Sequence, residues 1–250
     1  MIILKLHERL ILNKYFLSLF GVDRFADFRP EEEREANLRD VLKNVEENFE
    51  NTDRSNYMNS ILNSTLLNID KQLKVKLETY DKNIMEYINF INQKREKPIF
   101  LTYFQYLSIL FTEIYLDRYY NDRNKFITDL NDFVDKVNME IKESKNKYSH
   151  FHERDLNKLA FYMATGSGKT LIMHINYLQF KKYSNQEINN ILLITPNSGL
   201  SRQHLEEFEK SSIKAQLFID NLMGFKEEDY IYIIEITKLV QKKEGEGDSV

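Results

Sequence analysis

The stretch Met163-Ala164-Thr165-Gly166-Ser167-Gly168-Lys169-Thr170 decides how the second half of the chain folds. An apolar run precedes it and an amphipathic run follows it, so the sequence predicts a strand at Leu159–Ala164 and a helix at Gly168–Lys182. Two glycines between these elements allow the backbone to turn sharply. The pattern is that of a phosphate-binding loop, or P-loop, except that Met163 occupies the position of the first glycine.

The residues of this loop suit the binding of a nucleotide. Without a Cβ, Gly166 and Gly168 let successive N–H groups and the helix N-terminus point at a phosphate. Lys169 would supply a positive charge to the β- and γ-phosphates, and Thr170 a hydroxyl ligand to Mg²⁺. An ordinary glycine turn would not explain Gly168, Lys169 and Thr170 together. The expected nucleotide-binding residues are Ala164, Thr165, Gly166, Ser167, Gly168, Lys169 and Thr170.

Beyond the loop, short apolar runs alternate with amphipathic ones. The predicted strands are Ile191–Thr195, Ile213–Ile219 and Tyr230–Ile236, and a helix is predicted at Leu200–Ser211. Strands that alternate with helices indicate a parallel sheet covered on both faces, with the P-loop at the carboxyl end of its strand. Residues 151–250 are therefore predicted to form an α/β domain.

The first half of the chain has the pattern of long helices. It contains no glycine over residues 22–165 and only two prolines, so few of its residues suit tight turns. Apolar residues repeat at steps of three and four, which predicts helical faces at Leu38–Phe49 and Ile61–Ile91 and helices at Ile99–Tyr120 and Lys125–Lys145. We therefore predict an all-helical accessory domain over residues 1–150.

The composition limits the class of protein. Hydrophobic residues make up 42% of the chain and charged residues 30%, which is typical of a folded globular protein. The absence of cysteine excludes disulfides and fits a cytoplasmic protein. No run approaches the roughly 18 uncharged apolar residues of a membrane span, so no membrane partner is expected. The net charge is −4, but residues 144–183 carry seven Lys or Arg against two acids, enough for a local phosphate-binding surface.

A second motif follows the P-loop. About twenty residues after Thr170 comes Ile191-Leu192-Leu193-Ile194-Thr195-Pro196-Asn197-Ser198-Gly199-Leu200-Ser201-Arg202-Gln203-His204-Leu205. Together with Ala164–Thr170, this stretch resembles motifs I and Ia of superfamily 2 (DEAD/DEAH-box-like) helicases, most of all the motor subunits of type III and type I restriction enzymes. The resemblance covers about Lys158 to Leu239, roughly a third of the chain.

The resemblance implies a fold and an activity. The fold would be an incomplete RecA-like α/β domain, and the activity that of an ATP-dependent helicase or translocase, with ATP and Mg²⁺ as cofactors and DNA as the nucleic acid. Lys169 and Thr170 would be catalytic, and Thr170 the Mg²⁺ ligand. Thr237 and Lys238 resemble a later strand-end motif, and subunits of a restriction-modification or defence system are the implied partners. The residues implied to grip the nucleic-acid backbone are Thr195, Pro196, Asn197, Ser201 and Arg202.

The sequence also departs from that family. No Asp-Glu-x-His or other acidic Walker B motif follows, Glu235 lacks a neighbouring aspartate, and Glu227-Glu228-Asp229 fits a solvated turn. Hydrolysis needs carboxylates for Mg²⁺ and water, and an arginine finger. We therefore expect the chain to be the N-terminal part of a longer motor, which alone binds ATP weakly and hydrolyses it negligibly.

Other interpretations stay open. The chain could be a P-loop ATPase with another substrate, or the helical half could be a protein-interaction module in a catalytically inert chain. Pro196–Gly199 could be an ordinary turn with Ser201 as a helix cap. His150, His152, Glu153 and Asp155 have no recognised metal-ligand spacing, which favours a solvated linker. The aromatic residues between Phe100 and Tyr120 recur at helical spacing, which favours a core over a base-stacking surface.

Overall fold

The structure is a computed structural model that describes residues 9–46, 54–185, 191–218 and 230–238. It divides into two compact units, which are described separately. The first comprises residues 1–85 and 100–167, and the second residues 86–99 and 168–250. Compact units need not coincide with functional domains, so the domain boundary expected between residues 150 and 151 stays a prediction.

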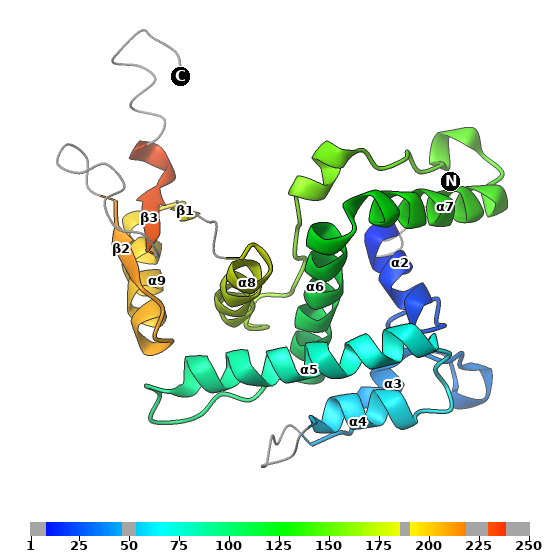
Figure 1. Ribbon diagram of the computed structural model, residues 1–250, viewed down its shortest axis with the longest axis horizontal. Coiled ribbons are helices and arrows are strands. Elements are labelled where there is room, and N and C mark those ends of the chain that lie inside the picture. The colour runs from blue at the N-terminus through cyan, green and yellow to red at the C-terminus, as the bar shows by residue number, and fades with distance from the viewer. Residues whose placement is uncertain (1–8, 47–53, 186–190, 219–229, 239–250) are drawn as a thin grey trace, which may run out of the picture. The chain divides into compact units, whose positions relative to one another are not determined.

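The described part of the first unit is helical and contains no strand (Figure 1). This confirms the predicted fold class for the first half of the chain. The predicted apolar face from Ile61 to Ile91 belongs to two helices, because Asp70 starts the second one by accepting a hydrogen bond from the N–H of Gln72 at 2.8 Å. Phe49 lies outside the described residues. The helices are α2 (Ile11–Leu19), α3 (Leu38–Leu42), α4 (Asn56–Asn63), α5 (Lys71–Asn92), α6 (Tyr103–Asn121) and α7 (Arg123–Glu140). The part of α5 from residue 86 onward belongs to the second unit.

The core of the first unit is built around α6. Tyr106, Ile109, Leu110 and Ile114 of this helix are fully buried. The hydroxyl of Tyr106 donates a hydrogen bond to the buried carboxylate of Asp81, and burial raises the pKa of this tyrosine well above its ordinary value. The aromatic residues of α6 thus form a core, as predicted, although Tyr120 and the preceding Phe100 remain partly exposed.

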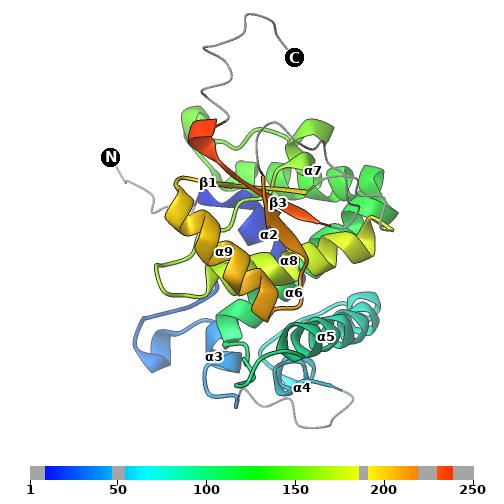
Figure 2. The ribbon, with the colours of Figure 1, turned by 90° about the vertical axis from the view of Figure 1, so that its left-hand side faces the viewer.

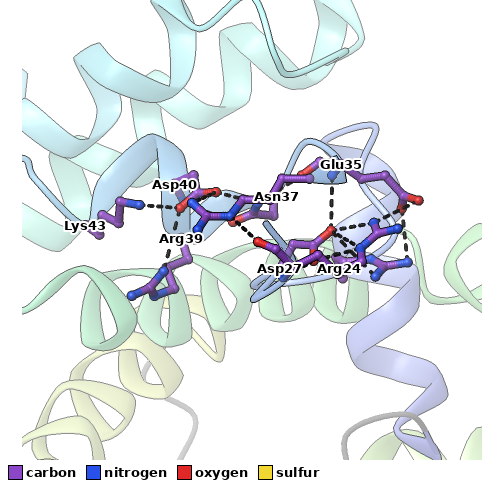
Figure 3. Close-up of polar contacts among 9 residues, drawn as sticks. Arg24, Asp27, Glu35, Asn37, Arg39, Asp40 and Lys43 are labelled. Atoms are coloured by element: carbon purple, nitrogen blue, oxygen red, sulfur yellow. Dashed lines mark hydrogen bonds and ion pairs between the residues drawn. The ribbon is translucent and has the colours of Figure 1, made fainter. Parts of the chain in front are cut away.

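A charged network fixes the irregular segment before α3 (Figure 3). The buried carboxylate of Asp27 accepts hydrogen bonds from the backbone N–H groups of Arg29 and Glu35, each at 3.1 Å, and from the Arg29 guanidinium. These bonds hold the pKa of Asp27 well below its usual range. Asn37 then begins α3 by accepting a bond from the N–H of Asp40 at 2.9 Å. Side-chain contacts therefore fix this segment, whose only described regular element is a short 3-10 helix at Glu31–Glu33.

Two asparagines of α7 hold the connector that leads toward the P-loop. The side chain of Asn131 bonds both the N–H and the C=O of Phe151, at 2.7 and 3.1 Å. Asn138 bonds the same two backbone groups of Tyr148, at 2.8 and 2.9 Å. Farther along, the hydroxyl of Tyr115 donates to the C=O of Leu156 at 2.6 Å. The connector is thus fixed to the helices without forming a strand.

The second unit contains a three-stranded parallel sheet (Figures 1 and 2). Strand β3 lies in the middle, with β1 and β2 on either side. Three predicted strands and two predicted helices are confirmed, although β2 is shorter than expected. In chain order the elements are α8 (Lys169–Tyr183), β1 (Ile191–Thr195), α9 (Ser198–Lys210), β2 (Ala215–Leu217) and β3 (Ile231–Glu235).

Helices cover one face of this sheet. Phe208 of α9, with Ile213, Ile231 and Ile233, forms a buried cluster, against which Met173 and Tyr177 of α8 and Phe90 of α5 pack. Successive strand residues point to opposite faces. On the other face of β1, Leu192 and Ile194 are 47% and 51% exposed. The prediction of cover on both faces is therefore wrong for β1 in the part of the chain that the structure describes.

The strand predicted at Leu159–Ala164 is also absent from the described structure. These residues have no regular secondary structure. They belong to the first unit, where they line a pocket of about 750 Å³ together with residues of α2 and α6. An apolar run forms a strand only where a neighbouring strand supplies hydrogen bonds, and the described part of this unit contains no strand. The expectation of a P-loop at the carboxyl end of a strand is therefore wrong as well.

Candidate nucleotide and nucleic-acid site

The two glycines of the P-loop adopt conformations that favour glycine. Gly166 has a φ of 78° and Gly168 a φ of 86°, both in the left-handed region. A Cβ built on Gly166 would meet no atom within 4 Å, so the backbone angle and not the space requires glycine there. The sequence correctly placed a sharp turn at these positions.

The turn leads directly into α8 and leaves the first turn of that helix without a side-chain cap. Gly168 is the N-cap residue, and the N–H of Ile172 bonds its C=O at 3.1 Å. The first N–H groups of a helix have no partner within the helix. No acidic residue stands in the first turn of α8. These N–H groups and the positive end of the helix dipole form a site suited to a phosphate.

Contacts within the first unit fix the residues just before α8. The hydroxyl of Ser167 donates to the C=O of Ala164 at 2.6 Å. The side-chain amide of Gln105, at the start of α6, donates to the C=O of Ser167 at 2.8 Å and accepts from the N–H of Thr102 at 2.9 Å. Sequence reasoning missed Gln105, which lies 62 residues from Ser167 with no local pattern to connect them. Lys169 has an exposed side chain, and Thr170 is half-buried.

The second motif forms a closed turn between β1 and α9. The hydroxyls of Thr195 and Ser201 lie 2.6 Å apart, and Ser201 donates to the C=O of Asn197 at 3.1 Å. Thr195 is only 2% exposed and Ser201 only 5%. Asn197 is the N-cap of α9, because its side chain accepts from the N–H of Leu200 at 2.9 Å. Thr195 and Ser201 therefore shape the turn from the inside.

The outer surface of this turn is formed by the other implied nucleic-acid contacts. Pro196, Asn197 and Arg202 are exposed. The structure thus separates the five residues into two buried ones that hold the turn and three that face solvent. At the end of β3, Thr237 donates to the carboxylate of Glu235 at 2.9 Å, and both Thr237 and Lys238 are exposed.

The remaining candidate groups have local partners. His150 Nε2 lies 2.7 Å from the carboxylate of Asp135, and the carboxylate of Asp155 accepts from the N–H of His152 at 2.8 Å. In the described residues, no group of three or more His, Cys, Asp or Glu side chains is placed to hold a metal ion. The predicted turn at residues 227–229 lies outside the described residues. Thr170 as a Mg²⁺ ligand stays a prediction.

The helices of the first unit and the parallel sheet of the second are consistent with a helical domain plus a partial RecA-like α/β domain. Residues 130–249 match the family model described as type III restriction enzyme, res subunit. This part, just under half of the chain, is therefore similar to that family, which is an ATP-dependent helicase-like family of the DEAD-like superfamily 2. Neither a curated protein nor a solved structure matched the chain. Among the described helices, none is both long and apolar enough to cross a membrane.

Proposed function

We propose that this protein binds ATP with Mg²⁺ through residues 164–170 and a nucleic-acid backbone through the outer surface of the turn before α9. It would do so as part of an ATP-dependent DNA helicase or translocase of the restriction-enzyme type. Thr170 would hold Mg²⁺, and Lys169 would neutralise the charge of the β- and γ-phosphates. Subunits of a restriction or defence system are the proposed partners.

The start of α8 carries this proposal. Two left-handed glycines, a helix with no side-chain cap and an adjacent lysine occur in one run of four residues. Helix α2 also lacks a side-chain cap, but its N-cap residue is Leu10 and not a left-handed glycine. Elsewhere, α3, α4, α7 and α9 begin with a residue whose side chain accepts a hydrogen bond from the first turn, namely Asn37, Ser55, Asp122 and Asn197. Because those side chains occupy the N–H groups that an anion would need, the uncapped α8 is the better phosphate site.

Titration with a fluorescent ATP analogue and Mg²⁺ tests the nucleotide part. We expect saturable binding that Lys169→Ala weakens by about tenfold or more, since a hydrogen bond to a charged group contributes about 1.5–3 kcal/mol. Lys71→Ala is the matched control, because Lys71 is also an exposed lysine that begins a helix, α5. That control should bind as the unmodified protein does. Equal binding by the Lys169 and Lys71 variants would contradict the assignment.

Titration with a single-stranded oligonucleotide at several salt concentrations tests the nucleic-acid part. Phosphate contacts make affinity fall with salt, and each lost contact reduces the log–log slope by about one. Arg202→Ala should therefore lower both the affinity and the slope. Lys210→Ala removes the same charge at the other end of α9 and should change neither. Affinity that does not depend on salt would argue against a backbone-binding surface.

A further inference from the structure

A buried polar cluster in the second unit joins three segments that are far apart in sequence. Ser211, at the C-terminal end of α9, is fully buried. Its hydroxyl accepts a hydrogen bond from Nη2 of Arg95 at 2.7 Å and lies 2.8 Å from Nδ1 of His174. Arg95 follows α5, and His174 lies in α8. One oxygen atom therefore connects the segment after α5 with α8 and α9.

The hydrogen bond between Arg95 and Ser211 has a fixed direction. Arginine only donates, so Ser211 Oγ accepts from Arg95 and can give its own proton to His174 Nδ1. The roles of Ser211 and His174 depend on the tautomer of His174, and a neutral imidazole can accept the Ser211 proton at Nδ1. The pKa of His174 is lowered to about 4, chiefly by burial and also by the charges of Arg95 and His204, while Glu207 acts in the opposite direction. The surroundings thus favour the neutral imidazole that this arrangement needs.

Packing fixes the same contact. The imidazole of His174 stacks on the ring of Phe208 in α9, with the ring centroids 4.4 Å apart and the planes inclined by 22°. Arg95 also donates from Nε to the C=O of Ile91 at 3.3 Å, and lies 3.8 Å from the carboxylate of Glu207. A buried polar group that finds its partners in only one arrangement resists displacement, because moving it would leave it unpaired. The cluster therefore holds α8 and α9 in one register.

Both helices begin at a proposed binding segment. His174 lies five residues after Lys169, which is about 7.5 Å along α8, and Ser211 ends the helix that Asn197 begins. We propose that Arg95, Ser211 and His174 are positioning residues that couple nucleotide binding at the start of α8 to nucleic-acid binding at the start of α9. This inference rests on the proposed function. A helix moves as a rigid element, so a shift of α8 on phosphate binding is passed to α9 through this contact.

Thermodynamic linkage tests the inference. The affinity for a non-hydrolysable ATP analogue with Mg²⁺ is measured with and without a saturating single-stranded oligonucleotide. Allosteric coupling typically changes affinity by about 5- to 150-fold, and the same factor must appear when the roles of the two ligands are exchanged. We expect coupling of about fivefold or more in the unmodified protein, and a factor close to one in Ser211→Ala. Each ligand alone should bind that variant within about twofold of the unmodified protein, which a general loss of structure would not allow.

Two further variants separate positioning from stability. His174→Asn keeps an acceptor for the Ser211 hydroxyl and should retain coupling, whereas His174→Leu should lose it. Ser184→Ala is the matched control, since Ser184 ends α8 as Ser211 ends α9. Coupling that survives in both Ser211→Ala and His174→Leu would overturn the inference, as would binding of both ligands without coupling in the unmodified protein. Failure of the unmodified protein to bind either ligand would instead overturn the proposed function, and the inference with it.

Discussion

Helices α8 and α9 both follow a tight turn, but a side chain caps the first turn of α9 and none caps that of α8. Asn197 caps α9 with its side chain, and the buried pair of Thr195 and Ser201 closes the turn behind it. Gly168 has no side chain with which to cap α8. A capped helix must contact phosphates through exposed side chains such as Arg202, whereas an uncapped one can offer its backbone. The comparison therefore distinguishes the two proposed ways of binding phosphate, through side chains at α9 and through the backbone at α8.

The largest expected effect is that of pH on stability, through His174 in the contact between α8 and α9. The pKa of His174 is lowered to about 4 from an ordinary value of 6.5, because burial disfavours the charged imidazole. The folded state thus binds this proton less readily than the unfolded state. The contribution of His174 to the free energy of unfolding should be fully present above pH 6.5. It should be lost as the pH falls toward 4, by about 3 kcal/mol in total. Urea unfolding at a series of pH values measures this decline.

His174→Asn provides the control for that experiment. Asparagine keeps an acceptor for Ser211 but does not titrate, so this variant should lose the contribution of His174 to the decline between pH 6.5 and 4. His204, whose pKa is also lowered, keeps its own contribution in this range. The carboxylates of Asp40 and Asp117 have lowered pKa values, and their contribution is lost at more acidic pH. An identical pH dependence in the variant would show that His174 is not the responsible group.

Replacing the N-cap glycine of α8 should have the next largest effect. Gly168→Ala places a Cβ on a residue with a φ of 86°, which costs about 1–2 kcal/mol for a non-glycine residue. The strained turn should also misdirect the N–H groups at the start of α8, so ATP-analogue binding should weaken. Thermal unfolding and nucleotide titration of the same preparation measure both effects. Unchanged nucleotide affinity in a folded variant would argue against backbone binding of phosphate.

Removing the cap of α9 should cost less and leave the nucleotide site intact. Asn197→Ala deletes the acceptor for the N–H of Leu200, which typically destabilises by about 1 kcal/mol. Because α8 needs no such side chain, ATP-analogue affinity should stay the same. Denaturant titration gives the stability change, and a nucleotide titration of the variant checks the second part. A large loss of nucleotide affinity would mean that the two turns are not independent in their local structure.

The smallest effect is expected at the glycine of the capped turn. Gly199 lies in the first turn of α9 and does not have a left-handed φ. Alanine there gains helix propensity, but its Cβ would lie 3.3 Å from Oδ1 of Asn197. The two opposing terms should leave the stability of Gly199→Ala within about 0.5 kcal/mol of the unmodified protein. Comparison with Gly168→Ala shows whether left-handed geometry, and not glycine as such, distinguishes the two turns.

Local patterns in the sequence predicted the elements that depend on local physics. The strand at residues 191–195 and the helix after Gly168 were correct because apolar periodicity and glycine placement act over a few residues. The prediction of a strand at Leu159–Ala164 was wrong because a strand also needs a neighbouring strand, which no local pattern supplies. Cover over Leu192 and Ile194 depends in the same way on which other segments reach that face.

Contacts between distant residues were beyond the reach of sequence patterns. Arg95 and Ser211 are 116 positions apart, and His174 and Ser211 are 37 apart. Each residue alone has an ordinary surface interpretation, since nothing in its neighbours indicates burial with a particular partner. The candidate P-loop residues could be identified because their chemistry requires them to be consecutive. The residues that position the loop and its helix, such as Gln105 and His174, are under no such constraint.

The two asparagines of α7 fix the number of connector residues between the positions to which they are hydrogen-bonded. Asn131 and Asn138 are seven residues apart, which is about 10.5 Å along a helix. Phe151 and Tyr148 are three residues apart, which is about 10 Å along an extended chain. The two spacings match, so both asparagines are satisfied only when two residues separate their targets. One residue inserted or deleted between Tyr148 and Phe151 would break the hydrogen bonds of at least one asparagine. A length change before Tyr148 or after Phe151 would leave the hydrogen bonds of both asparagines intact.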